Sequence, residues 1–135
     1  MASIRKEVAI DATPDQVWDA LRDVGALHTR LVTGFVTDCK LDGDARIVTF
    51  ANGMVARELI VDIDDASRRV AWAAVGGRLT HHNASAQVLA ADRGHCRVVW
   101  IADLLPNEMA PAIAAMIEQG LGAMKKTLEG AARSA

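Results

Sequence analysis

Apolar and polar residues alternate along most of this chain, and a period of two is typical of β-strands. The alternation begins at residues 4–10. After residue 30 it returns in six segments separated by short turns, namely 31–41, 45–50, 54–63, 69–75, 79–89 and 96–105. The Asn52-Gly53 pair between two of them is the strongest hairpin signal in the sequence. The pattern therefore predicts seven strands, the last six of which form an antiparallel meander.

Two regions have helical spacing instead. Thr13 can cap a helix, Pro14 suits the first helical position and Gln16 completes a capping box, so a short helix is predicted there. Residues 26–30 can form a second short helical turn. From residue 107 to about residue 130, apolar residues recur at helical intervals and predict a long C-terminal helix. Its stripe consists of Ile113, Met116, Ile117, Gly120, Met124 and Leu128.

The order of these elements predicts the fold class. A sheet needs its apolar face covered, and the C-terminal helix is the only predicted element long enough to cover it. We therefore expect an α+β fold in which a seven-stranded, curved antiparallel sheet surrounds a long C-terminal helix. Two short helices would follow the first strand. No repeat, linker or boundary divides the sequence, so residues 1–135 are predicted to form a single domain.

Composition narrows the class of protein. Of the 135 residues, 51% are hydrophobic and 24% charged, which fits a folded domain and not a disordered chain. The net charge of −2 argues against a nucleic-acid partner. No segment approaches the roughly 18 apolar residues of a membrane span, and no signal peptide is recognised. Cys39 and Cys96 are not spaced as a CxxC pair and are expected to be reduced thiols. We expect a cytoplasmic monomer or homodimer without stable membrane insertion.

One segment carries a resemblance to a known family. Ile10-Asp11-Ala12-Thr13-Pro14-Asp15-Gln16-Val17-Trp18 joins a strand to a helix as in the START-related SRPBCC superfamily, and it resembles the polyketide cyclase/dehydrase and lipid-transport branch. Residues 57–64, residues 96–103 and Gly120-Leu121 support the resemblance, which covers essentially the whole chain. It implies a helix-grip fold with a cavity between the sheet and the helix. Residues 25–31 depart from the pattern that many members show near the pocket mouth, so no ligand preference is transferred.

Strand alternation predicts which side chains face the interior. In residues 54–63 the more apolar face holds Val55, Leu59, Val61 and Ile63, and Arg57 shares it. In the later strands the inner positions are mostly small residues together with two tryptophans. They are Val70, Trp72, Ala74, His82, Ala84, Ala86, Val88, Val98, Trp100, Ala102 and Leu104. Since only 4% of the chain is aromatic, we expect small residues to leave a hollow that Trp72 and Trp100 line.

The predicted ligand-binding residues come from these faces and from the helix stripe. They are Arg57, Leu59, Trp72, His82, Ala84, Trp100, Met116 and Gly120. Each has a simpler alternative. The tryptophans and methionines can be ordinary core residues, Gly120 can permit close packing, and His82 can be a histidine with satisfied hydrogen bonds at the pocket edge. Arg57 can pair with an acid or reach solvent at the strand end.

Three functions are compatible with this pattern. The favoured one is binding or carriage of a small hydrophobic molecule, such as a lipid, a quinone or a polyketide-like compound. The second is a cyclase or dehydratase in which Arg57 stabilises an enolate and His82 transfers a proton. This hypothesis fails if the two side chains point outward or lie far apart. The third is a protein-interaction module, which predicts a filled core and an exposed apolar patch.

Other chemistry has no support in the sequence. His81 and His82 are adjacent in a strand and so point to opposite faces, and no zinc-binding cluster is present. Neither GxGxxG nor GxxxxGK[ST] occurs, so no nucleotide cofactor is indicated. We therefore predict neither a cofactor nor a metal.

Overall fold

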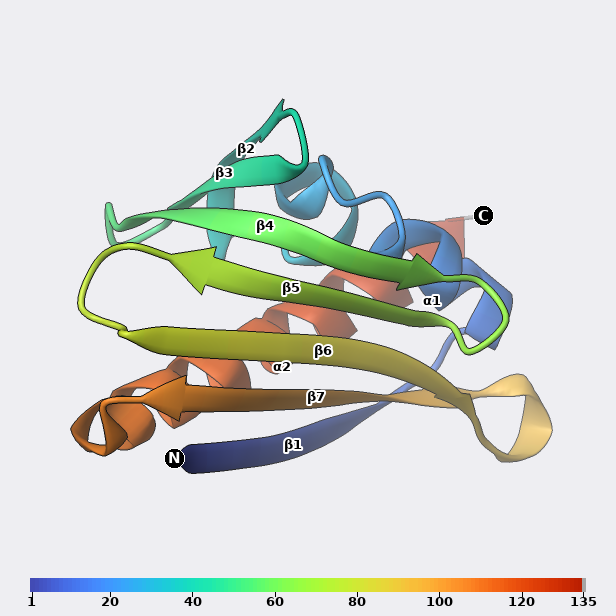
Figure 1. Ribbon diagram of the computed structural model, residues 1–135. Helices are drawn as coiled ribbons and strands as arrows, with labels where there is room; N and C mark the ends of the chain where they lie inside the picture. The colour runs from blue at the N-terminus through green and yellow to red at the C-terminus, as the bar shows by residue number, and fades with distance from the viewer. Residues whose placement is uncertain (135) are drawn as a thin grey trace.

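One antiparallel sheet organises the computed structural model, which describes residues 1–134. Its strand order is β1-β7-β6-β5-β4-β3-β2 (Figure 1). The strands are β1 (Ala2–Ile10), β2 (Val36–Asp42), β3 (Ala45–Phe50), β4 (Val55–Asp64), β5 (Arg69–Val75), β6 (His81–Ala90) and β7 (Cys96–Leu105). Strands 2 to 7 follow one another as the predicted meander. β1 then pairs with β7 at the far edge, with Ile4 opposite Ala102.

Two short helical segments follow β1, as predicted. The first, α1 (Pro14–Leu21), has the capping box that the sequence indicated. The Gln16 backbone N–H donates to Thr13 Oγ1 at 3.1 Å, and the Thr13 N–H donates to Gln16 Oε1 at 3.0 Å. The second, η1 (Leu27–Leu31), is a turn of π-helix. It takes Leu31 out of the predicted second strand, so β2 begins only at Val36.

The C-terminal helix, α2 (Ala110–Ser134), crosses the inner side of the sheet (Figure 1). Two short 3₁₀ turns, η2 (Asp92–Gly94) and η3 (Asn107–Met109), precede β7 and α2 respectively. Ion pairing holds α2 to β1, since Lys6 Nζ lies 2.9 Å from Glu118 Oε1. Lys125 Nζ also donates to the Ala9 carbonyl oxygen at 2.8 Å. The seven-stranded antiparallel sheet with α2 across its inner side confirms the predicted helix-grip fold (Figure 1).

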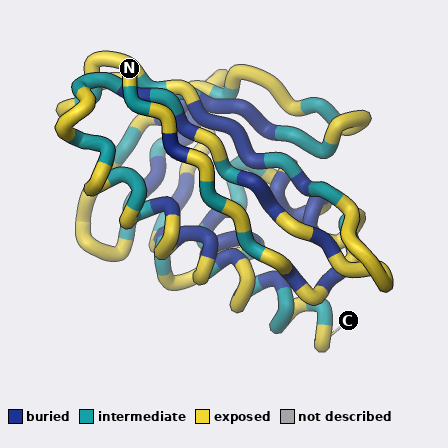
Figure 2. Tube along the Cα trace, turned by 90° about the horizontal axis from the view of Figure 1, so that it is seen from below, coloured by how far each residue is buried: buried dark blue, intermediate teal, exposed yellow. Residues whose placement is uncertain are grey.

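The core lies between α2 and the concave face of the sheet, and buried positions line both (Figure 2). On β6 and β7 the predicted inner faces are correct. Ala84, Ala86, Val88, Val98, Ala102 and Leu104 are all buried. On α2 the buried residues are Ile117, Gly120, Leu121, Met124 and Leu128. Within residues 1–134, no helix combines the length and apolarity of a membrane span.

The prediction for β4 is wrong, because this strand turns its other face inward. Val55 is 62% exposed and Val61 is 58% exposed, and Leu59 and Ile63 are also exposed. Glu58 is buried instead. Alternation leaves two possible inner faces for this strand, and hydrophobicity alone favours the more apolar one. Across the hairpin, Arg46 of β3 satisfies the Glu58 carboxylate, so a charged residue can take the inner position.

Candidate functional site

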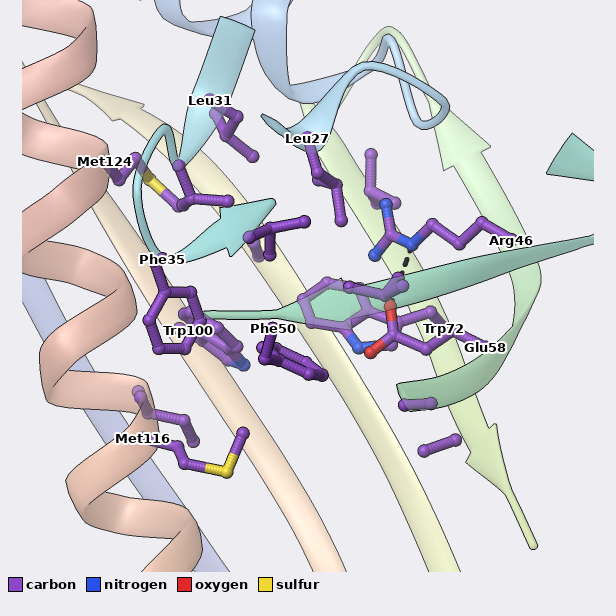
Figure 3. Close-up of a pocket in the computed structure, with 18 of the residues that line it drawn as sticks. Leu27, Leu31, Phe35, Arg46, Phe50, Glu58, Trp72, Trp100, Met116 and Met124 are labelled. Carbon is purple, nitrogen blue, oxygen red and sulfur yellow. Dashed lines mark hydrogen bonds and ion pairs between the residues drawn. The ribbon is translucent and has the colours of Figure 1, made fainter. Parts of the chain in front are cut away.

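A cavity of about 140 Å³ remains inside the core, between α2, η1 and the sheet (Figure 3). For scale, an engineered apolar cavity of about 150 Å³ in another protein holds a benzene molecule. Strands β2 to β7 form its floor and walls, and η1 closes one side. The lining is mainly apolar and includes Leu27, Leu31, Val48, Val70, Ala86, Ile117 and Met124.

Aromatic rings occupy two parts of the cavity wall. Trp72 of β5 and Trp100 of β7 meet edge to face, with ring centroids 5.7 Å apart and planes at 65°. Phe35 and Phe50 meet in the same way at 5.5 Å and 76°. All four rings line the cavity. They provide flat apolar surfaces, which suit contact with another ring.

A buried ion pair forms the polar part of the wall. Arg46 Nε donates to Glu58 Oε1 at 2.8 Å, and the two side chains are only 5% and 11% exposed. The guanidinium also donates to the Val24 carbonyl oxygen at 3.3 Å and lies over the Trp72 ring, 5.4 Å from its centroid (Figure 3). Because each charge has a partner, the pair adds no net charge to the cavity.

His82, at the start of β6, also lines the cavity. Its Nδ1 accepts a hydrogen bond from the Ala74 backbone N–H at 2.9 Å. Burial lowers the pKa of His82 below its usual value near 6.5, and nearby His81 lowers it further, although Glu58 acts in the opposite direction. The ring is therefore neutral at pH 7. Since Nδ1 is the acceptor, the proton is on Nε2.

The cavity opens at one end of the molecule. The β3–β4 turn, the β5–β6 loop and the start of α2 all lie at this end (Figure 1). They contribute Met54, Leu79, Ile113 and Met116 to the lining, and all four are at least partly exposed. His82 is close to this end because it follows the β5–β6 loop directly. We call this end the mouth of the cavity.

The structure places four of the eight predicted binding residues on the cavity wall: Trp72, His82, Trp100 and Met116. Ala84 is buried next to them, opposite Trp72 in the sheet. Gly120 lies behind the wall, where a methyl group would come within 2.8 Å of the Trp100 ring. Gly120 thus permits close packing of α2 on Trp100.

Arg57 and Leu59 are the two predicted site residues that the structure contradicts. Both lie on the outer face of β4, away from the cavity. Arg57 pairs with Asp42 at 2.7 Å and is 44% exposed at the surface. The hypothesis of a cyclase that uses Arg57 with His82 therefore fails, because only His82 faces the interior.

Arg46 and Glu58 are the main residues that the sequence analysis missed. Opposite charges on the two strands of a hairpin can indicate that the two residues pair across the strands. However, a two-residue turn at Asn52-Gly53 would place Arg46 opposite Leu59. The observed register places it opposite Glu58, one residue earlier. Phe50 is the last residue of β3, and Phe35 lies in the turn before β2 although the pattern predicts a strand there. At neither position does strand alternation fix the direction of the side chain.

Comparison with known proteins agrees with this architecture. A family model described as polyketide cyclase/dehydrase and lipid transport matches residues 1–129. The chain belongs to this family. This match confirms the predicted resemblance to the polyketide cyclase/dehydrase and lipid-transport branch. None of the curated proteins matches the chain.

Solved structures of low sequence identity share the fold. An uncharacterised protein from Bacillus thuringiensis is 18% identical, with a TM-score of 0.84 over 94% of this chain and 98% of the other. Norcoclaurine synthase from Thalictrum flavum, a point mutant in complex with a transition-state analogue, is 19% identical, with a TM-score of 0.74 over 98% and 94%. A START superfamily protein from Mycobacterium smegmatis is 12% identical, with a TM-score of 0.73 over 98% and 97%.

Proposed function

We propose that this family member binds a small hydrophobic molecule in the cavity between the sheet and α2. The cavity itself carries the proposal. Protein interiors are normally packed without voids much larger than a water molecule, so a ring-sized space is unusual. Its lining combines apolar and aromatic surface with a few polar groups, which is the usual composition of a small-molecule site.

The volume supports a ligand of about one ring in preference to a complete lipid. Ligand pockets for drug-sized molecules are about 300–1,000 Å³, larger than the 140 Å³ present here. The family description, which includes both lipid transport and cyclisation, agrees with an apolar ligand. A binding role also accounts for the cavity better than an interaction module, for which a filled core was expected.

A pair of variants on β5 tests this function. Ala74 lines the cavity, and the preceding residue Ala73 points to the outer face, opposite Leu59. In Ala74→Leu the larger side chain would fill part of the cavity, and in Ala73→Leu the same side chain would lie outside it. Binding of toluene, styrene and acetophenone is measured by two-dimensional NMR titration.

We expect wild type and Ala73→Leu to bind at least one of these compounds. In both proteins the same residues, those that line the cavity, should show the NMR chemical-shift changes. Ala74→Leu should bind at least about tenfold more weakly, because the ring and the leucine compete for the same volume. Shift changes spread over the outer face, or equal binding by both variants, would contradict the proposal.

A further inference from the structure

We propose that the ligand is a neutral molecule with a hydrogen-bond acceptor, such as a ketone, aldehyde or ester, and that His82 recognises this acceptor through its Nε2–H. The inference deepens the proposed binding function and rests on it. It is carried by the way β5 and β6 hold the His82 ring at the cavity mouth.

The first observation is a local opening of the sheet. The ladder between β5 and β6 runs from Arg69 opposite Gln87 to Trp72 opposite Ala84 and then stops. Two residues further along this register, Ala74 faces His82. Here the Ala74 N–H donates to the His82 side chain and not to a backbone carbonyl. The imidazole therefore takes the place of a ladder partner, which fixes its position at the wall of the cavity.

The second observation is that this hydrogen bond fixes which nitrogen of the ring is the remaining donor. Nδ1 accepts from Ala74 at 2.9 Å, so the neutral ring carries its hydrogen on Nε2. Within residues 1–134 no hydrogen bond from Nε2 is found, and the ring lines the cavity. Nε2 is not among the buried nitrogen and oxygen atoms that lack a partner, so solvent reaches it in the free protein. A ligand that covers Nε2 must supply an acceptor, because leaving this donor buried without a partner is costly.

The third observation concerns charge. Among the lining residues, all of them in the described part of the chain, Arg46 and Glu58 are the charged pair. Arg46 is already bound to Glu58, to the Val24 carbonyl and to the face of Trp72. A ligand carboxylate would have to break this arrangement or remain unpaired in an apolar space. The cavity therefore selects against acids such as fatty or aromatic carboxylates.

Three compounds with one ring each test separately whether the ligand needs a hydrogen-bond acceptor and whether it must be uncharged. Acetophenone carries a carbonyl acceptor, α-methylstyrene replaces that carbonyl with a methylene group of similar shape, and benzoate carries a charge. Two substitutions separate the two nitrogens of the imidazole. In His82→Asn the amide oxygen can accept from Ala74 as Nδ1 does, but the Nε2–H is lost. In His82→Gln the amide nitrogen can replace the Nε2–H, and the acceptor for Ala74 is lost.

Affinities for the three compounds are measured by NMR titration at pH 7.5, together with the imidazole tautomer of His82 from long-range ¹H–¹⁵N spectra. We expect the Nε2–H tautomer in the free protein. His82→Asn should lower the affinity for acetophenone about five- to tenfold, which is the usual effect of losing one neutral hydrogen bond. The affinity of this variant for α-methylstyrene should stay within about twofold of the wild-type value. His82→Gln should retain most of the acetophenone affinity. Benzoate should bind at least about tenfold more weakly than acetophenone.

The outcomes distinguish this inference from the proposed function. If α-methylstyrene binds in the cavity but His82→Asn changes both neutral compounds equally, the His82 donor is refuted and the binding function stands. Benzoate binding more tightly than acetophenone, or an Nδ1–H tautomer, would also refute the inference. If neither neutral compound binds the wild-type protein at cavity residues, both proposals fail. A folding check by backbone NMR spectra accompanies each variant.

Discussion

Arg46 and Glu58 lie among apolar side chains, where either charge alone would be strongly destabilising. Their position opposite one another in the β3–β4 hairpin makes the 2.8 Å contact available. Arg57 and Asp42 form a comparable contact of 2.7 Å on the outside, where both side chains are well exposed. The two pairs have similar geometry and differ in burial, so together they isolate the effect of desolvation.

Substitution of the two arginines by methionine should therefore have different effects. Arg46→Met leaves the Glu58 carboxylate buried without a partner and should lower the free energy of unfolding by about 3–5 kcal/mol. Arg57→Met removes only an exposed pair and should change it by less than about 1 kcal/mol. Urea denaturation measures both. The double variant Arg46→Met/Glu58→Met should recover most of the loss, and similar costs for the two single variants would refute the argument.

His82 predicts how stability depends on pH. The unfolded chain takes up a proton at this residue near pH 6.5, whereas in the folded protein burial keeps the pKa lower. The stability contributed by the neutral ring is thus complete above pH 6.5 and is lost as the pH falls from there toward the folded pKa. Glu58, whose charge raises this pKa, and His81, which lowers it, are the charged or titratable neighbours that act on the ring.

We expect the free energy of unfolding of the wild type to decrease between pH 7 and pH 5 more steeply than that of His82→Asn. The variant keeps an acceptor for Ala74 but has no titrating group at this position. Urea denaturation at a series of pH values gives the difference between the two curves. Parallel curves over this range would contradict a depressed pKa for His82.

At the scale of elements, the contact between α2 and β7 sets the width of the cavity. Gly120 lies on the sheet-facing side of α2, where an added Cβ would be 2.8 Å from Cζ3 of Trp100 and 3.3 Å from Cε2 of Phe35. Both rings line the cavity. The absence of a side chain at Gly120 therefore allows the helix to approach the sheet while Trp100 keeps its place in the wall.

Gly120→Ala should accordingly destabilise the protein by about 1–3 kcal/mol, because Trp100 or the helix must move. Gly122, on the exposed side of the same helix, has no atom within 4 Å of an added Cβ. Gly122→Ala is thus a matched control, and it should stabilise the protein by up to about 1 kcal/mol through helix propensity. Thermal and urea denaturation measure the stability of both variants. If Gly120→Ala leaves the free energy of unfolding unchanged, Trp100 or α2 can shift at little cost and the argument is wrong.

At the scale of the whole molecule, the sheet separates the two cysteines. Cys39 lies on β2, at one edge of the sheet, and Cys96 lies on β7, next to the other edge. Both are free and buried. Burial raises the pKa of each thiol, with opposing effects from the charge of Arg46 on Cys39 and of Arg68 on Cys96. Both thiols therefore become reactive only when the structure opens.

Labelling with a thiol-specific reagent at pH 8 should be slow in buffer and should follow unfolding as urea is added. Because the two thiols lie on opposite sides of one cooperative fold, we expect both to become reactive in the same transition. Mass spectrometry of quenched samples counts the modified cysteines. A large population with one label in native buffer would show instead that one edge of the sheet opens locally.

The sequence was sufficient to predict most helices and strands and the inner faces of β6 and β7. Their inner positions combine apolar character with regular alternation, so both criteria agree at Ala84, Val98 and Leu104. It also predicted that Trp72 of β5, His82 of β6, Trp100 of β7 and Met116 of α2 line the interior, and all four lie on the cavity wall. It failed on β4, where the apolar side chains Val55 and Val61 lie outside and Glu58 lies inside.

By itself, the sequence determined the order of strands and helices, the capping box at Thr13 and the family, because periodicity and capping depend on residues close together in the chain. Only the tertiary structure decided which face of β4 turns inward. Alternation states that positions 56, 58 and 60 share a face but not which face is buried. That choice depended on Arg46, a residue of another strand, and on a hairpin register that places it opposite Glu58. The polar part of the cavity follows from this long-range pairing.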